Sequence, residues 1–164
     1  METGEHAKIP LVETNLSVPK RQVRVTLTTP VETIDGFVFA AEFSEHTRGA
    51  ERVGEILNRA AAFLPVRDER DGRVHLYNKA SIVAVTVVEP ERREWEVEEL
   101  EFSPAEKVEV RLTSGDVLSG VTYLDPRREK SRVSDLLNRP EAFLVLVREE
   151  GVTYVSKLYI ERVA

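Results

Sequence analysis

A thirteen-residue stretch occurs twice in this chain, and the repeat constrains the fold more than any other feature. Residues 52–64 read RVGEILNRAAAFL and residues 132–144 read RVSDLLNRPEAFL, so eight of the thirteen positions are identical at a spacing of eighty residues. Two more exchange like for like, Glu55 with Asp135 and Ile56 with Leu136. An internal repeat indicates one supersecondary unit used more than once. We therefore expect two copies of one small unit in the 164 residues.

The segments that flank the repeat predict short strands. Apolar residues alternate with polar ones in the pattern of a half-buried strand at Val23, Val25 and Leu27 and again at Val108, Val110 and Leu112. A second strand follows each of these and opens on Gly36 or Gly120, and glycine there often marks the bend by which a small sheet curls. Two further strands and a last one in the matched segments 78–85 and 156–163 give five strands per unit.

The repeated stretch itself predicts a short amphipathic helix. Its apolar residues fall at i, i+3 and i+4 on one face, at Val53, Ile56 and Leu57 and at Val133, Leu136 and Leu137. Because Pro140 disfavours helix at the residue before it, the second copy is expected to end near Asn138, with asparagine in a left-handed conformation. Small sheets avoid open edges by closing. The prediction is a mainly β fold of two tandem five-stranded small barrels, each with one short helix inserted between strands 2 and 3.

The predicted organisation has four parts: an N-terminal arm at 1–18, a first barrel repeat at 19–88, an acidic linker at 89–107 and a second barrel repeat at 108–164. The net charge is −6, and the linker alone carries eight acidic and three basic side chains. The linker is expected to be largely solvated, with Trp95 in an apolar alternation that packs part of it onto a barrel. Both repeats are near neutral, whereas a nucleic-acid surface is usually a concentrated basic field.

Several classes of protein are disfavoured by what the chain lacks. Without cysteine it has no disulfides, thiolate chemistry or cysteine-bound zinc. No run approaches the roughly 20 apolar residues needed to cross a bilayer, and the first residues lack the pattern of a signal peptide, so a cytoplasmic location without membrane contact is expected. The three histidines lack metal-ligand spacing, and the carboxylates of Asp68 and Asp71 fall in a hairpin turn where water screens them. We expect no metal, no cofactor, no catalytic residue and no enzyme.

Polar residues that recur in both units are the candidate binding residues: Arg52, Asn58, Arg59 and Lys79 in the first, and Arg132, Asn138, Arg139 and Lys157 in the second. One interpretation is structural, because asparagine can end the helix and arginine can pair with local carboxylates or cover apolar surface with its stem. The other is a repeated docking face for a protein or an anionic ligand.

Three segments resemble the motifs of the Sm-like proteins, a variety of the Src-homology-type small barrel. VEVRLTSGDVLSGVTYLD at 108–125 resembles the first Sm motif, and the Lys-x-x-Ile-x-x-Val endings at 79–85 and 157–163 resemble the turn and last strand of the second. Family members that bind RNA use an aspartate and an asparagine after the second strand and an arginine-glycine pair before the last. Here the inserted helix occupies the first place, and Asn78-Lys79 or Ser156-Lys157 stand at the second.

These observations predict a non-enzymatic binding or scaffolding protein that acts through protein contacts. The alternatives are an Sm-like RNA-binding protein and a receptor for a small anionic ligand such as a nucleotide. The resemblance also implies that a homo-oligomer is open to this chain, because Sm-like barrels often assemble through edge strands.

Overall fold

The computed structural model describes residues 20–45, 49–127 and 131–164, so the expected arm at 1–18 lies outside the described residues. The first half holds β1 (Lys20–Thr28), β2 (Thr33–Ala41), α2 (Val53–Leu57), β3 (Phe63–Asp68), β4 (Val74–Asn78), the 3-10 turn η1 (Lys79–Ser81) and β5 (Ala84–Val87). Next come α3 (Pro90–Val97) and the 3-10 turn η2 (Glu98–Leu100). The second half holds β6 (Ala105–Leu112), β7 (Val117–Tyr123), α4 (Val133–Leu137), β8 (Phe143–Val147), β9 (Val152–Ser156), the 3-10 turn η3 (Lys157–Tyr159) and β10 (Ile160–Val163).

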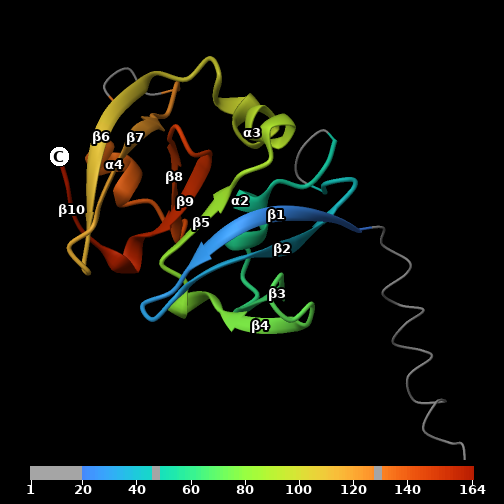
Figure 1. Cartoon of the computed structure of the whole chain (residues 1–164). Helices are drawn as coiled ribbons and strands as arrows, with labels where there is room; N and C mark the ends of the chain where they lie inside the picture. Colours follow the sequence, from blue (N-terminus) through green and yellow to red (C-terminus); the bar gives the residue numbers. More distant parts are fainter. Residues whose placement is uncertain (1–19, 46–48, 128–130) are drawn as a thin grey trace, which may run out of the picture.

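All ten strands of the described part belong to one antiparallel sheet in the order β10-β6-β7-β8-β9-β5-β1-β2-β3-β4. Each half repeats the same internal order, with its fifth strand beside its first and its fourth strand at the far side. The mainly β fold is confirmed, but the two separate closed barrels of the prediction are not shown. Because the outer edge of β5 pairs with β9, the halves form one continuous, unclosed sheet that curls in each half (Figure 1).

The repeated stretch forms a short helix in both halves, between the second and third strands as predicted. Glu55 Oε1 accepts a hydrogen bond from the Arg52 backbone N–H at 3.0 Å, and Asp135 Oδ2 accepts the equivalent bond from Arg132 at 3.0 Å. This capping contact explains why the two acidic residues exchange like for like. The expected left-handed asparagine is wrong, because Asn58 and Asn138 have φ near −90°. Each instead donates its N–H back to the carbonyl four residues earlier.

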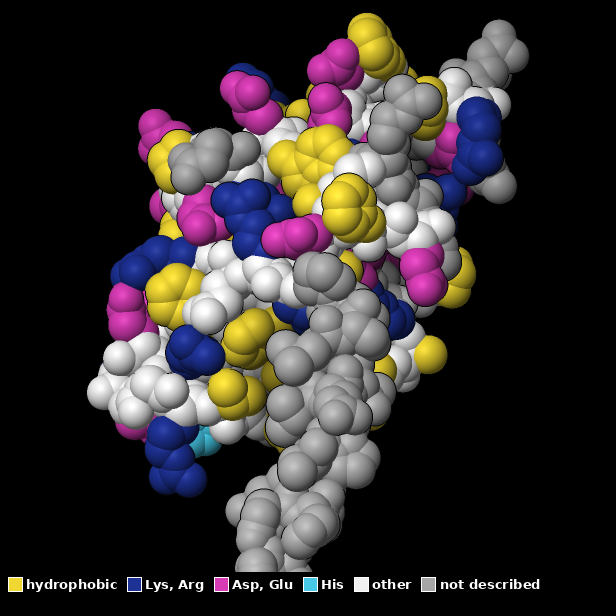
Figure 2. Space-filling model, turned by 90° about the vertical axis from the view of Figure 1, so that its right-hand side faces the viewer, with side chains coloured by type: hydrophobic (Ala, Val, Ile, Leu, Met, Phe, Trp, Pro, Cys, Tyr) yellow, Lys and Arg dark blue, Asp and Glu magenta, His cyan; other side chains and the backbone are white. Residues whose placement is uncertain are grey.

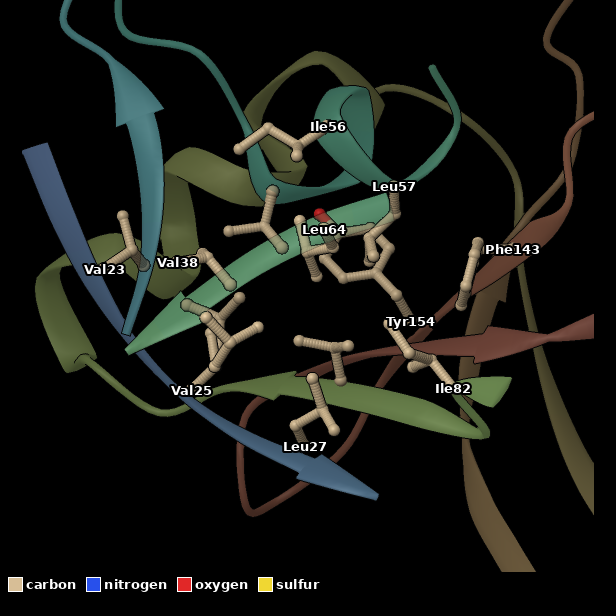
Figure 3. Close-up of a cluster of buried hydrophobic side chains, with 14 of the residues drawn as sticks. Val23, Val25, Leu27, Val38, Ile56, Leu57, Leu64, Ile82, Phe143 and Tyr154 are labelled. Carbon is tan, nitrogen blue, oxygen red and sulfur yellow. The ribbon is translucent and has the colours of Figure 1, made fainter. Parts of the chain in front are cut away.

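The core crosses the boundary between the halves. The larger buried cluster is formed mainly by the first half and also contains Phe143, Val152 and Tyr154 of the second (Figure 3). In the same way, Val83 and Ala84 belong to the cluster of the second half. Burial of apolar side chains is the main favourable contribution to folding. The two halves therefore stabilise each other. The helices of the described residues are all too short or too polar to cross a lipid bilayer.

Close backbone approach explains the glycine that each half places in its second strand. A Cβ added to Gly36 would lie 2.5 Å from the carbonyl oxygen of Arg67, and one added to Gly120 would lie 2.6 Å from that of Val147. Both contacts are with backbone of the neighbouring third strand, which cannot move aside without disturbing the sheet. The two glycines thus have the same role in the two halves, which is to let the second strand lie close to the third.

We predict that Gly120→Ala lowers the free energy of unfolding by about 1–3 kcal/mol, as expected for an overpacked site. The adjacent, exposed Ser119→Ala is the matched control and is expected to change it by less than about 0.5 kcal/mol. Urea denaturation followed by circular dichroism measures both. Equal stability of the two variants would contradict the close approach.

Candidate functional site

A cleft of about 470 Å³ lies between α2 and the second half of the chain. It contains four of the eight predicted binding residues: Arg52 and Asn58 from the end regions of α2, and Arg139 and Lys157 from the second half. Its apolar lining includes Leu100, Leu136, Phe143 and Val145, and its acidic lining includes Glu55, Glu96, Glu99 and Glu141. The structure does not bring Arg59, Lys79, Arg132 or Asn138 into this cleft.

Arg52 is held by the segment that the sequence predicted to be a largely solvated linker. That segment forms α3 and η2, and the Arg52 guanidinium lies 4.4 Å from the centre of the Trp95 ring. Its Nε donates to the Trp95 carbonyl oxygen at 2.8 Å, and its NH1 pairs with Glu99. Only 6% of Arg52 is exposed. The contacts assign this arginine to packing of the linker onto the first half.

Trp95 also anchors this segment to the first half. Its indole N–H donates to the Ala50 carbonyl oxygen at 3.1 Å. The expectation that Trp95 packs this segment is met, but by a helix rather than by an alternating extended segment. In agreement with this, Phe102, which lies just beyond the end of η2, is 89% exposed.

Asn58 and the two lysines hold backbone groups. Asn58 Oδ1 accepts a hydrogen bond from the Phe143 backbone N–H at 2.9 Å and so links the two halves. Lys79 Nζ donates to the carbonyl oxygens of Ile56 and Arg59 at 2.7 and 3.1 Å. Lys157 does the same with Leu136 and Arg139 at 3.1 and 3.0 Å.

A positive charge at these positions stabilises the negative end of a helix. Burial lowers the pKa of both lysines. Each repeated lysine therefore caps the C-terminal end of one repeated helix. This structural role explains why the lysine recurs without invoking a ligand.

The remaining repeated residues have local ionic partners or stand at the surface. Arg59 pairs with the buried carboxylate of Glu51, and Arg139 lies 3.5 Å from Asp125. The side chain of Arg132 is 75% exposed and lies 3.7 Å from Asp135. Asn138 donates its side-chain N–H to the Ser134 carbonyl oxygen at 2.8 Å.

A buried polar network behind the cleft was not predicted from the sequence. Glu96 is 4% exposed and accepts hydrogen bonds from the Val53 backbone N–H at 2.8 Å, from Tyr154 Oη at 2.6 Å and from Arg92 Nε at 2.9 Å. Arg92 also donates to the Glu51 carbonyl oxygen. These contacts tie α3 to the start of α2 and to β9. The sequence signal that could have revealed this network is the helical spacing of residues 92, 95, 96 and 99. Interpreting the segment as extended concealed that spacing.

The chemistry of this network is that of a fixed structural contact. Burial, followed by the charge of Glu96, raises the pKa of Tyr154 well above its ordinary value. The carboxylate of Glu96 accepts three donors, one of which is the Arg92 guanidinium. A satisfied carboxylate beside a tyrosine that stays neutral favours a role in holding elements together.

The charges of the cleft do not favour an anionic ligand. Its four glutamates face three basic residues, and one of these, Arg52, is already paired with Glu99. Figure 2 shows one face of the molecule, on which basic, acidic and hydrophobic side chains are interspersed. Neither feature resembles the concentrated basic field of a nucleic-acid surface.

Three possible metal ligands come together at the β3–β4 hairpin, although their spacing did not suggest a site. Ligand atoms of Asp68, Asp71 and His75 lie within 4.8 Å of one another. Arg70 donates to Asp68 from its Nε at 3.1 Å and from its NH2 at 2.7 Å, and these bonds lower the pKa of Asp68. A guanidinium at the cluster opposes a cation there. The contacts are those of an ion-paired hairpin turn.

Comparison of the chain with protein-family models, with curated proteins and with solved structures finds no match.

The repeat supplies a matched pair of variants that separates a structural arginine from a surface one. We predict that Arg52→Ala lowers the free energy of unfolding by about 2 kcal/mol, because it removes a buried hydrogen bond and the contact with Trp95. Arg132→Ala is expected to change it by less than about 0.5 kcal/mol. Urea denaturation of both variants tests this. A loss at Arg132 as large as that at Arg52 would contradict the assignment.

Tyr154 predicts a pH dependence at the alkaline end. Tyrosine in the unfolded chain ionises near pH 10, whereas the folded state resists ionisation, so stability should fall as pH rises above about 10 by up to about 1.4 kcal/mol per pH unit from this group. Tyr154→Phe removes this contribution. The variant should start less stable at pH 8 but lose less stability between pH 9 and 11. Urea denaturation of both proteins at pH 9 and pH 11 measures this. Equal losses of stability in the wild type and in Tyr154→Phe would show that Tyr154 is not the group responsible.

Proposed function

We propose that this protein is a non-enzymatic binding or scaffolding module that works through protein contacts. The observation that carries the proposal is the set of apolar side chains at the outer end of the first half. Phe63 is 53% exposed, Val74 is 48% exposed and Leu76 is 66% exposed, and all three lie on β3 or on the outer strand β4. Edge strands with exposed apolar residues are sites at which another chain can add a strand.

The second half supports this assignment. The counterparts of these residues are Phe143, Val152 and Tyr154, and they are 5%, 0% and 4% exposed. They are buried because the first half packs against them. The surface that packs against the other half of the chain in the second half is therefore exposed to solvent in the first half.

We also propose that each half is a small barrel of the Sm-like kind, open on one side. The repeated strand order in the two halves and the curl of the sheet support this finer description. The resemblance in sequence points the same way.

The alternatives receive less support from the side chains. Seven of the eight repeated polar residues that would bind RNA or a nucleotide contact a carboxylate or a backbone carbonyl of the chain itself, and the eighth, Asn58, accepts a backbone N–H. Retention of single-stranded RNA on a filter at low salt, lost steeply as salt is added, would favour the RNA-binding alternative. A thermal shift with a nucleotide would favour the anionic-ligand alternative.

A photo-crosslinking residue tests the proposed function in the cells that make the protein. We expect benzoyl-phenylalanine in place of Leu76 to give covalent adducts with protein at the β4 edge. The matched control is the same residue in place of Val31, which is 88% exposed and lies in the β1–β2 turn. Adducts no more abundant at position 76 than at position 31 would overturn the proposed function.

A further inference from the structure

A second pocket, of about 460 Å³, lies between the linker and the end of β7. It is lined by three apolar or aromatic side chains and three carboxylates: Trp95, Val97, Tyr123, Glu94, Glu98 and Glu101. We propose that this pocket binds a basic segment of a partner protein, which places an arginine side chain beside Trp95 and Tyr123. The pocket is separate from the β4 edge, so this contact goes beyond the function proposed there and does not depend on it.

The linker sorts its charges so that only acidic side chains line the pocket. It holds eight acidic and three basic residues. Arg92 is 4% exposed and donates from its Nε to Glu96 at 2.9 Å, and Arg93 donates to the Arg148 carbonyl oxygen at 3.1 Å. None of the six lining residues is basic. The pocket therefore presents the acidic part of the segment that carries most of the net negative charge of the chain.

Two of the three carboxylates have no cation of their own. In the described residues, neither Glu94 nor Glu101 takes part in an ion pair, and both are exposed. Glu98 lies 3.9 Å from Arg52, which also pairs with Glu99. Charge complementarity selects partners by sign. Unpaired carboxylates around an aromatic pocket thus favour a positively charged occupant over a neutral or negative one.

Trp95 is held in place before any partner binds. Its indole N–H donates to the Ala50 carbonyl oxygen at 3.1 Å, and a Cβ on Gly49 would lie only 2.7 Å from its ring. The Arg52 guanidinium lies 4.4 Å from the centre of the same ring, which shows that the ring accepts a guanidinium. A ring that is already fixed loses little conformational freedom when another side chain docks beside it.

The counterpart of Tyr123 in the first half already holds an arginine. Each half places an aromatic residue three positions after the glycine of its second strand, at Phe39 and Tyr123. The Arg67 guanidinium lies 5.8 Å from the centre of the Phe39 ring. Val147 takes the place of Arg67 in the second half, because the carbonyl oxygens of these two residues approach the two equivalent glycines.

Tyr123 is therefore left without the cation that its counterpart has. In the part of the chain that the structure describes, no arginine or lysine lies over the Tyr123 ring. A guanidinium supplied by a partner would make there the cation–π contact that the first half makes within itself.

The chemistry of the pocket favours arginine over lysine. A guanidinium is planar, so it can stack on an aromatic ring and pair with a carboxylate at the same time, whereas an ammonium is a compact, strongly hydrated charge. Glu94 in α3 and Glu101 just after η2 stand at opposite ends of the lining segment. A segment with two or more arginines fits this arrangement better than a single small cation.

Titration with a peptide of alternating glycine and arginine tests the proposal. The control peptide has citrulline in place of arginine, which keeps the shape of the side chain and removes its charge. Trp95 is the only tryptophan of the chain, so its fluorescence reports occupation of the pocket directly. The arginine peptide is expected to change the emission in a saturable way that weakens as salt is added. No saturable change, or an equal change with the citrulline peptide, would overturn the proposal.

Two variants locate the binding. Glu94→Gln combined with Glu101→Gln removes two exposed carboxylates and should weaken binding about five-fold. Tyr123→Leu keeps an apolar side chain but removes the aromatic face, and should weaken binding about three-fold. Thermal unfolding establishes that both variants fold. Binding as tight as that of wild type in both folded variants would overturn the proposal.

The matched control is Glu106→Gln combined with Glu149→Gln. Both residues are exposed and lie outside the pocket, and the pair changes the net charge by the same amount. This control should bind the arginine peptide as wild type does. A control weakened as much as the pocket variant would show attraction to net charge alone and overturn the proposal.

Two further arms separate the partner and the site from the alternatives. Displacement of the peptide by spermine at an equal concentration would show a polyamine site and overturn the protein partner. Benzoyl-phenylalanine at position 76 should still give adducts in the chain that carries Glu94→Gln and Glu101→Gln. Failure of the pocket therefore leaves the function proposed at the β4 edge standing.

Discussion

The pairing of β5 with β9 is the contact on which the rest of the structure depends. It makes one sheet of two repeated halves. Around it, Phe143 and Tyr154 of the second half enter the core of the first, and Asn58 fixes the start of β8 by a hydrogen bond to Phe143. Strand pairing satisfies the backbone groups of β5 and β9, and burial of apolar side chains is the main favourable contribution to the free energy of folding. Each half would lose both kinds of contact without the other.

The acidic segment between the halves secures this junction. Glu96 joins the start of α2 to Tyr154 of β9, and Arg92 on the same helix faces that carboxylate. A buried charge is tolerated only when it is paired and hydrogen-bonded. The network thus fixes the position of α3, and with it Trp95 and the guanidinium of Arg52.

The sequence predicted the elements of each half more successfully than their assembly. Periods of two and 3.6 residues are local, and they placed the strands and the helix at Val53 and Val133 correctly. The shared sheet could not be predicted in this way, because whether β5 closes on its own half or pairs with β9 is a long-range choice. The same limit applies to Asn58, whose recurrence was visible but whose partner is 85 residues away. Arg92 and Glu96 were missed because the high acidic content of the segment suggested solvation and its apolar residues suggested an extended rather than a helical conformation.

Hydrogen exchange of the β9 backbone amides measures the central claim most directly. The claim is that the pairing of β5 with β9 joins the two halves into one sheet, so the N–H groups of Tyr154 and Ser156 should be protected from exchange. The N–H groups of Leu76 and Asn78, their counterparts on the outer strand β4, should exchange much faster. Exchange of Tyr154 and Ser156 as fast as that of Leu76 and Asn78 would contradict the account.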